Sequence, residues 1–372
     1  MENICSQLLE RCLLGETWTR DEMASALALD GGRVFLSTVV ERLGDLFEPE
    51  LSNTYSTLFT QVIHSVAPEL VSRIHKAAPT SVAPTETMRV YVLSRVTLGA
   101  DVAVTSVLMD AAKKKYPHAQ VFFVGPRRSY ELFETDSRIS HLAAPYARSG
   151  TLAERLKASA DLWLSDGIVI DPDSRLTQLG LISVCDENRY FCFPSRSYGG
   201  TGNDSLPTLA ARWAQEVFGT ANAQPWVAPR RSNNAAAEIA VSLGVGENPA
   251  KRCDDAFEKQ LLHLLADTGA SIVIDEGGDA EERARVQRAL IPGMRTHSGS
   301  FASFASLISQ SRLYVGYDSA GGHVASACGV PLISIAKGFV NKRMAARWRP
   351  NGVIIDGDDA DALLHIHSAI HV

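Results

Sequence analysis

The 372-residue sequence has few cysteines, and it lacks both a positive net charge and a long hydrophobic run. Its six cysteines are scattered, and no two are spaced as in a zinc knuckle, which argues against a disulfide framework or a zinc site. With 36 basic and 42 acidic side chains the net charge is −6, so no general positive field attracts nucleic acid. No apolar run approaches the roughly 18 residues of a bilayer-spanning helix, and the N-terminus lacks the basic start of a signal peptide. We therefore expect a cytoplasmic protein with a small-molecule partner.

The hydrophobic pattern divides the chain into three parts. With 45% hydrophobic and 21% charged residues, a chain of this length is expected to form two or three globular domains. Residues 1–88 show helical periodicity, and their last segment, 77–87, combines prolines with small polar residues as a linker does. A second break, rich in proline, arginine and asparagine, spans residues 222–234. We expect a helical N-terminal extension over residues 1–88 and two further domains over 89–228 and 229–372.

From residue 89 onward, short apolar runs alternate with helical segments, which predicts βαβ units and a parallel sheet in each of the two later domains. We expect strands over residues 90–93, 121–124, 163–170, 238–243, 271–274, 313–316, 331–335 and 353–355. We expect helices over residues 100–116, 206–218, 255–266, 280–290, 300–309 and 320–328. Two Rossmann-like α/β domains of this kind face each other across a cleft, where the carboxyl ends of both sheets meet a ligand.

The most specific motif lies between the strand expected over residues 313–316 and the next helix. It consists of Asp318, Ser319, Ala320, Gly321, Gly322 and His323. The free N–H groups and the positive end of a helix suit a diphosphate, and the glycines let the backbone approach it closely. In this interpretation Asp318 positions the amides or a hydroxyl, and His323 donates to a phosphate oxygen. In the structural alternative, Ser319 caps the helix, the glycines pack it on the sheet, and His323 is a satisfied surface side chain.

A second glycine-containing loop follows the first strand of the last domain. Gly244 and Gly246 begin it like a dinucleotide-binding fingerprint, but Pro249 occupies the place of the third glycine. Lys251 and Arg252 stand just before a helix N-terminus, where two cations oppose the helix dipole unless an anion lies between them. We expect this loop to contact the same phosphates, and the structural alternative is a solvated basic pair.

The first α/β domain offers polar residues at the ends of two strands. Asp101 stands in the first helical turn after a glycine, where it could act as a general base on an attacking hydroxyl or only complement the helix dipole. Asp171 ends another strand in the sequence Asp-Pro-Asp-Ser-Arg, which either holds a metal or forms a turn. Because no further carboxylate cluster accompanies it, we favour a turn that directs Arg175 into the cleft. Arg95, Asp171 and Arg175 are the residues expected on the acceptor side.

These residues together resemble the family 9 glycosyltransferases of the GT-B fold, typified by the ADP-heptose:lipopolysaccharide heptosyltransferases. The resemblance covers residues 89–372. Residues 98–106 and 113–117 are similar to the family's Leu-Gly-Asp-Val…Thr helix and the Lys-x-x-Tyr-Pro that follows it. Residues 318–327 and 329–331 are similar to its Asp-Ser-Gly…His…Ala…Gly-x-Pro donor motif.

The resemblance implies inverting transfer of a sugar such as a heptose from a nucleotide diphosphate such as ADP to a hydroxyl of a glycan or glycolipid, with no metal or other cofactor. It implies Asp101 as the catalytic base, Lys251 as the cation on the donor diphosphate, and Asp318 to His323 as the diphosphate cradle. The sequence departs from the family at Ala100, which is inserted before the aspartate, and in residues 1–77, which lie outside the pattern. The resemblance also implies a cytoplasmic enzyme that can lie peripherally at the inner membrane.

Two other functions compete with this one. The sequence around Ser319 also resembles the nucleophile elbow of an α/β hydrolase, with Asp356 and one of His365, His367 or His371 following in the order of that fold. The missing first glycine of the elbow and the two-domain layout count against it. The third possibility is a catalytically silent subunit that binds a nucleotide sugar, because the inserted Ala100 could have displaced the base.

Overall fold

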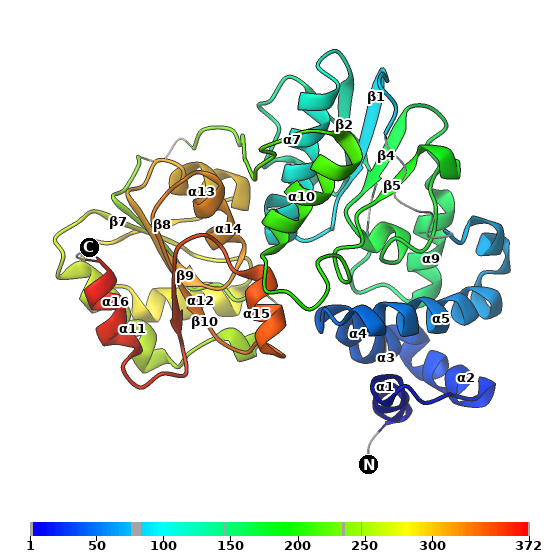
Figure 1. Ribbon diagram of the computed structural model, residues 1–372. Helices are drawn as coiled ribbons and strands as arrows, with labels where there is room; N and C mark the ends of the chain where they lie inside the picture. Colours follow the sequence, from blue (N-terminus) through cyan, green and yellow to red (C-terminus); the bar gives the residue numbers. More distant parts are fainter. Residues whose placement is uncertain (1–2, 76–82, 145, 233–234, 247, 371–372) are drawn as a thin grey trace.

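The computed structural model describes residues 3–75, 83–144, 146–232, 235–246 and 248–370, and it contains a group of N-terminal helices and two α/β domains (Figure 1). Each α/β domain is built on one parallel sheet with helices on its faces. The expected architecture of two Rossmann-like domains with an extra helical region is therefore confirmed.

The N-terminal helices pack into a core of their own. They are α1 (Ile4–Leu14), α2 (Arg20–Ala28), α3 (Arg33–Phe35), α4 (Glu41–Asp45) and α5 (Pro49–Val66), with short helical turns over Leu29–Gly32, Leu36–Val40 and Pro68–Arg73. Their buried side chains also contact Leu152, Leu156, Leu181 and Ile182 of the first α/β domain. This core attaches the helices to that domain, along its lower side in Figure 1.

One stretch of this region differs from the sequence-based expectation. By length and composition alone, Arg20–Asp45 is long and apolar enough to cross a membrane, although 39% of its most apolar window is buried inside the protein. Asp30 and Gly31, with φ of 47° and 60°, interrupt its helical backbone.

The linker expected over residues 77–87 lies outside the described residues up to residue 82, and residues 83–87 form no helix or strand.

The first α/β domain has the strand order β3-β2-β1-β4-β5. Its strands are β1 (Arg89–Leu93), β2 (Gln120–Gly125), β3 (Ile139–Ala143), β4 (Ile168–Asp171) and β5 (Tyr190–Cys192). Its helices are α6 (Leu98–Ala100), α7 (Ser106–Lys115), α8 (Arg127–Tyr130), α9 (Leu152–Asp161) and α10 (Leu206–Phe218), with a π-helical turn over Asp101–Thr105 between α6 and α7. The strand expected over residues 163–170 begins only at Ile168, because Gly167 turns the chain with φ of 70°.

The second α/β domain has the strand order β11-β10-β9-β6-β7-β8. Its strands are β6 (Ile239–Ser242), β7 (Ile272–Asp275), β8 (Arg295–His297), β9 (Leu313–Tyr317), β10 (Leu332–Ala336) and β11 (Val353–Asp356). Its helices are α11 (Asp255–Ala266), α12 (Ala280–Ala289), α13 (Phe301–Ile308), α14 (Ala320–Ala327), α15 (Lys342–Trp348) and α16 (Ala362–Ile370). Five of these strands and four of these helices were expected from the sequence.

Helix α15 connects the second α/β domain to the rest of the molecule. Arg347 is 1% exposed and donates to the carbonyl oxygens of Asp204 and Gly200 in the first α/β domain, at 2.7 and 2.9 Å. Arg343 donates to the carbonyl oxygen of Phe47 in the N-terminal helical region and forms an ion pair with Glu48. All three parts of the chain therefore meet at this helix.

Candidate active site

Lys251 lies at the carboxyl end of β9, beside the beginning of α14. Its Nζ is 2.5 Å from Oδ2 of Asp318 and 3.2 Å from the carbonyl oxygen of the same residue. The Phe339 ring lies 5.4 Å from the ammonium group. Gly338, at φ of 70°, passes so close to the Ala250 carbonyl that a Cβ there would lie 2.7 Å from its oxygen. The structure thus brings together the predicted lysine and the predicted aspartate, with Asp318 positioning the cation.

The beginning of α14 has no side-chain cap, but its glycines differ in how closely they pack against their neighbours. Ser319 is the N-cap residue, but its side chain makes no capping hydrogen bond, so the capping role considered from the sequence is wrong. Gly321 packs on the Tyr314 ring, since a Cβ at residue 321 would overlap the Tyr314 hydroxyl. Gly322 has no such close neighbour, because a Cβ there would meet its nearest atom at 3.7 Å. Ala320 lies against Gly99 of the first α/β domain.

His323, one turn into α14, is buried rather than on the surface. It is 8% exposed, and its ring centroid lies 6.0 Å from that of Trp348. Burial lowers the pKa of His323, Lys251 lowers it further, and Asp318 opposes the shift. In the described part of the chain the ring makes no hydrogen bond. A neutral imidazole can donate one N–H to an incoming phosphate oxygen.

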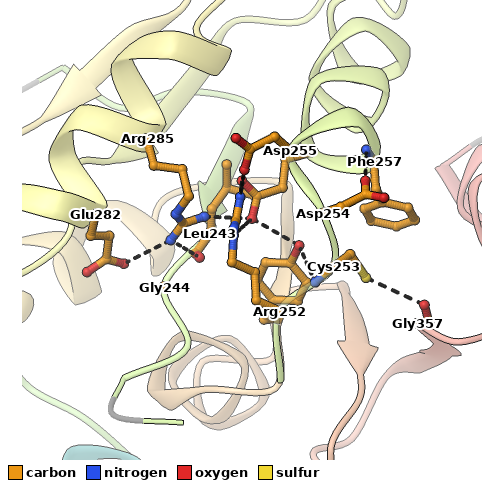
Figure 2. Close-up of polar contacts among 12 residues, drawn as sticks. Leu243, Gly244, Arg252, Cys253, Asp254, Asp255, Phe257, Glu282, Arg285 and Gly357 are labelled. Atoms are coloured by element: carbon orange, nitrogen blue, oxygen red, sulfur yellow. Dashed lines mark hydrogen bonds and ion pairs between the residues drawn. The ribbon is translucent and has the colours of Figure 1, made fainter. Parts of the chain in front are cut away.

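Arg252 does not point at the same site as Lys251, so its assignment to donor binding is corrected. Its Nε lies 2.9 Å from Oε1 of Glu258, and its guanidinium also pairs with Asp255, toward which Figure 2 shows it directed. Glu258 is fully buried and pairs with Arg285 at 2.6 Å, while Tyr317 donates to the same oxygen at 3.1 Å. A buried carboxylate needs these partners, which explains why Arg252 turns toward the protein interior.

The glycines of the preceding loop have different surroundings. Gly244 lies so close to the Glu282 carboxylate that a Cβ would overlap it. A carboxylate at this position would repel a diphosphate, which counts against the predicted contact of Gly244 with the donor. Gly246, at φ of 62°, has open space around it and lies in the turn that leads toward Lys251.

Asp101 lies in the interior and does not face the cleft. It is 0% exposed, and its carboxylate accepts hydrogen bonds from Ser94 Oγ, the Arg95 N–H and Thr105 Oγ1, at 2.7, 2.7 and 2.8 Å. Burial raises its pKa, and these hydrogen bonds oppose the shift. Each carboxylate oxygen already accepts at least one hydrogen bond and the side chain is fully buried, which counts against direct proton transfer from an acceptor to Asp101. The inserted Ala100 is accommodated in the helix that contains the π-helical turn.

Of the other residues expected on the acceptor side, Asp171 is buried and Arg175 contacts the N-terminal helical region. Asp171 is 0% exposed and accepts hydrogen bonds from Thr177, Tyr190 and the Ser174 N–H, so its expected place in the cleft is wrong. Arg175 lies 3.6 Å from Glu41 of the N-terminal helical region. The turn expected here does form, but Arg175 pairs with that region.

Arg95 occupies a central position between the domains. It donates to the Pro172 carbonyl at 2.5 Å and to Ser195 Oγ at 2.7 Å, and its guanidinium carbon lies 5.7 Å from the centroid of the Trp348 ring. Burial is the main cause that lowers the pKa of Arg95 to about 10. The side chain remains a cation at neutral pH and reaches from the first sheet to the second domain.

Asp173 is a site residue that the sequence did not single out. It is 4% exposed, and its Oδ2 accepts from Ser195 Oγ at 2.8 Å and pairs with Arg196 at 2.6 Å. Within the described residues, Oδ1 has no hydrogen-bond partner. The only sequence signal was the Asp-Pro-Asp sequence at the end of β4, in which the second aspartate, rather than the first, lines a pocket.

The hydrolase triad is not assembled among the described residues. His365 pairs with Asp359 at 3.5 Å, and His367 lines a hollow with α11 residues, whereas Ser319 lies at the start of α14. His371 lies outside the described residues. In the same described ranges, no three His, Cys, Asp or Glu side chains are grouped as a metal site would require.

Comparison with known proteins supports the resemblance seen in the sequence. Residues 218–351 match the family model of glycosyltransferase family 9 (heptosyltransferase). A search of curated protein sequences found no match.

Solved structures of heptosyltransferases share the fold of this chain. The E. coli heptosyltransferase WaaC with ADP-2-deoxy-2-fluoro heptose aligns with a TM-score of 0.57 and 16% identity, over 76% of this chain and 99% of that one. The E. coli ADP-heptose lps heptosyltransferase II aligns with a TM-score of 0.53 and 16% identity, over 76% and 98%. A family 9 glycosyl transferase from Veillonella parvula aligns with a TM-score of 0.56 and 14% identity, over 75% and 90%. The chain therefore has the GT-B fold of these enzymes, and its resemblance to family 9 is confirmed.

Proposed function

We propose that this glycosyltransferase-like protein moves a sugar, with inversion, from a nucleotide diphosphate to a hydroxyl of a glycan or glycolipid acceptor. The observation that carries the proposal is Lys251, fixed by Asp318 beside the uncapped beginning of α14. An ADP-linked heptose is the proposed donor, because the WaaC structure contains such an analogue.

In the proposed reaction the acceptor oxygen attacks C1 of the sugar as the bond from C1 to the diphosphate oxygen breaks. Negative charge then develops on the leaving diphosphate. We propose that the Lys251 ammonium, the first N–H groups of α14 and a neutral His323 N–H stabilise that charge. Because these groups are fixed before the reaction, they lower the barrier without needing to reorganise. We propose that no metal ion is required, so adding EDTA should leave turnover unchanged.

The proton of the acceptor hydroxyl needs a carboxylate on the side of the first α/β domain. We assign this role to Asp173, because one of its oxygens has no hydrogen-bond partner in the described structure and the other is held by Ser195 and Arg196. Asp101, which the family resemblance implied as the base, is instead a positioning residue that holds the Arg95 N–H.

A thermal-shift screen with ADP, UDP, GDP, TDP and CMP tests the proposed donor. A ligand that binds only the folded state at 100 times its Kd stabilises it by about 2.7 kcal/mol. We expect ADP to give the largest shift and Lys251→Met to abolish it, while Lys259→Met, an exposed lysine on α11, keeps it. Shifts with none of the nucleotides, or an undiminished shift in Lys251→Met, would overturn the proposal.

Measuring turnover distinguishes an active enzyme from a catalytically silent subunit that only binds the nucleotide sugar. An active enzyme releases ADP from ADP-heptose when an acceptor is present, whereas a binding subunit shows the thermal shift and releases none.

We further propose that the protein acts in the cytoplasm, with peripheral contact at the inner membrane where a glycolipid acceptor would lie. Flotation with vesicles of bacterial lipid extract tests that location.

A further inference from the structure

A pocket of about 320 Å³ lies between the N-terminal helical region and the first α/β domain. Helix α5 forms one side through Ser52 and Tyr55, and the segment after β5 forms the other. The aromatic side chains in its walls are Tyr55, Tyr190, Phe191, Tyr198 and Trp213. Its volume is within the range of small-ligand pockets, and residues outside the family pattern build one of its walls.

One end of this pocket carries the Asp173–Arg196 pair. The Nε of Arg196 is buried without a hydrogen-bond partner in the described structure, although a buried donor of this kind costs free energy unless it is satisfied. Gly44, on α4, makes room for the arginine, since a Cβ there would lie 2.6 Å from Arg196 Nε. The N-terminal helical region therefore shapes the polar end of the pocket, which is lined by Arg196 and by Asp173, whose Oδ1 is unpaired among the described residues.

The polar end is connected to the candidate active site by direct hydrogen bonds. Ser195 Oγ donates to Asp173 and accepts from Arg95. Arg95 in turn lies over the Trp348 ring, which lies beside His323. A group bound at Asp173 is thus only a few side chains away from the beginning of α14.

Backbone strain is concentrated around the same edge of the domain. Val96, Asp173 and Leu179 have φ of 61°, 67° and 62°. A positive φ is unusual for any residue with a Cβ and is a genuine outlier for a β-branched valine. Such conformations persist where the surrounding structure holds them, and they cluster at active sites and ligand clamps.

Charge balance indicates what kind of ligand fits. The ionisable side chains in the pocket wall are paired with each other: Asp173 with Arg196, and Glu187 with Nδ1 of His75 at 2.7 Å. No surplus cation is therefore present for a phosphate or carboxylate. Flat aromatic rings pack against the C–H faces of a sugar ring, while the polar end suits its hydroxyl groups.

We infer that this pocket binds the sugar ring of the acceptor, and that this ring is neutral and is held by the N-terminal helical region together with Asp173 and Arg196. The inference rests on the proposed transferase function and specifies its acceptor. It also gives the N-terminal helices a role in recognising the substrate.

Ligand-observed saturation-transfer NMR tests the inference with methyl glucoside, methyl mannoside, methyl galactoside and the anionic methyl glucuronide as probes. We expect a signal from at least one neutral glycoside and a weaker one from the glucuronide. Ser52→Trp, which fills the pocket, should remove the signal. Thr57→Trp, an exposed position on the same helix outside the pocket wall, should keep it. Gly44→Ala, which displaces Arg196, should weaken it in a protein that remains folded by circular dichroism.

Three results would overturn the inference: no signal from any neutral glycoside, an undiminished signal in Ser52→Trp, or a stronger signal from the glucuronide. The ADP thermal shift should be the same in Ser52→Trp and in the unchanged protein. A missing glycoside signal with a normal ADP shift would therefore contradict only the acceptor pocket. A missing ADP shift would contradict the proposed function itself.

Discussion

Gly99 and His323 lie against each other at the junction of the two α/β domains. A Cβ at residue 99 would lie 3.0 Å from Cδ2 of His323 and 3.3 Å from Cα of Ala320. The turn after β1 and the first turn of α14 are therefore in closer contact than a side chain on residue 99 would ordinarily allow. This contact fixes the distance between the two α/β domains at this point.

Replacing Gly99 by alanine should slow sugar transfer several-fold. The added methyl group must push His323 or the backbone at Ala320 by a few tenths of an ångström, and misplacement of this kind costs catalysis more than stability. Steady-state kinetics with ADP-heptose measures the effect. Gly278→Ala is the matched control, because nothing lies within 4 Å of a Cβ there. Turnover of Gly99→Ala equal to that of the control would contradict the prediction.

Replacing Arg252 by alanine should destabilise the protein and leave donor binding intact. Glu258 would remain buried with Arg285 and Tyr317 but without its Arg252 hydrogen bonds, which are worth about 1–3 kcal/mol. Urea unfolding should show a loss of that size, and ADP titration an unchanged Kd. Arg288→Ala, an exposed arginine on α12, should change neither. Weaker ADP binding without a loss of stability would instead return Arg252 to the donor site.

The sequence predicted most of the fold because buried parallel strands and amphipathic helices have strong hydrophobic patterns. Helices α10 and α11 have the predicted limits, and the Asp254 side chain caps the latter as an aspartate at that position should. Strands β3, β5 and β8 were not predicted. Each lies at the edge of its sheet, where only one neighbour pairs with it and polar side chains are tolerated, and β5 and β8 are also only three residues long.

The candidate site was predicted less completely, because spacing along the chain does not say which way a side chain points. Lys251 and Asp318 were predicted to share the donor site, and they form an ion pair. Asp101 and Asp171 were expected in the cleft, but both carboxylates turn inward toward hydroxyl and N–H donors. Asp173, two residues beyond Asp171, faces the pocket instead. Only the three-dimensional arrangement of the loops distinguishes these aspartates.

Replacing Asp101 by asparagine should lower the free energy of unfolding by about 1–3 kcal/mol and leave measurable turnover. In the variant, the side-chain NH₂ would face a hydroxyl or N–H group that donates to a carboxylate oxygen in the unchanged protein. Two donors would then face each other and that hydrogen bond would be lost. Urea unfolding and kinetics on the folded protein separate the two roles, with Asp173→Asn as the comparison. A positioning residue loses stability and keeps some activity. Full stability with abolished turnover in Asp101→Asn would establish it as the base and remove Asp173 from that role.

The stability of the protein should fall with pH partly because of His323. Its folded pKa lies below the unfolded value of 6.5, mainly because it is buried, so the unfolded state takes up a proton first as the pH falls. The free energy of unfolding should therefore decrease from pH 6.5 down to the folded pKa and be unaffected by this group above pH 6.5. Urea unfolding at pH 7.5 and pH 5 should show a smaller decrease in His323→Gln than in the unchanged protein. His118→Gln, at an exposed position, should show the full decrease. Equal decreases in all three proteins would mean that His323 is not held neutral, and its proposed N–H contact to the diphosphate would lose its basis.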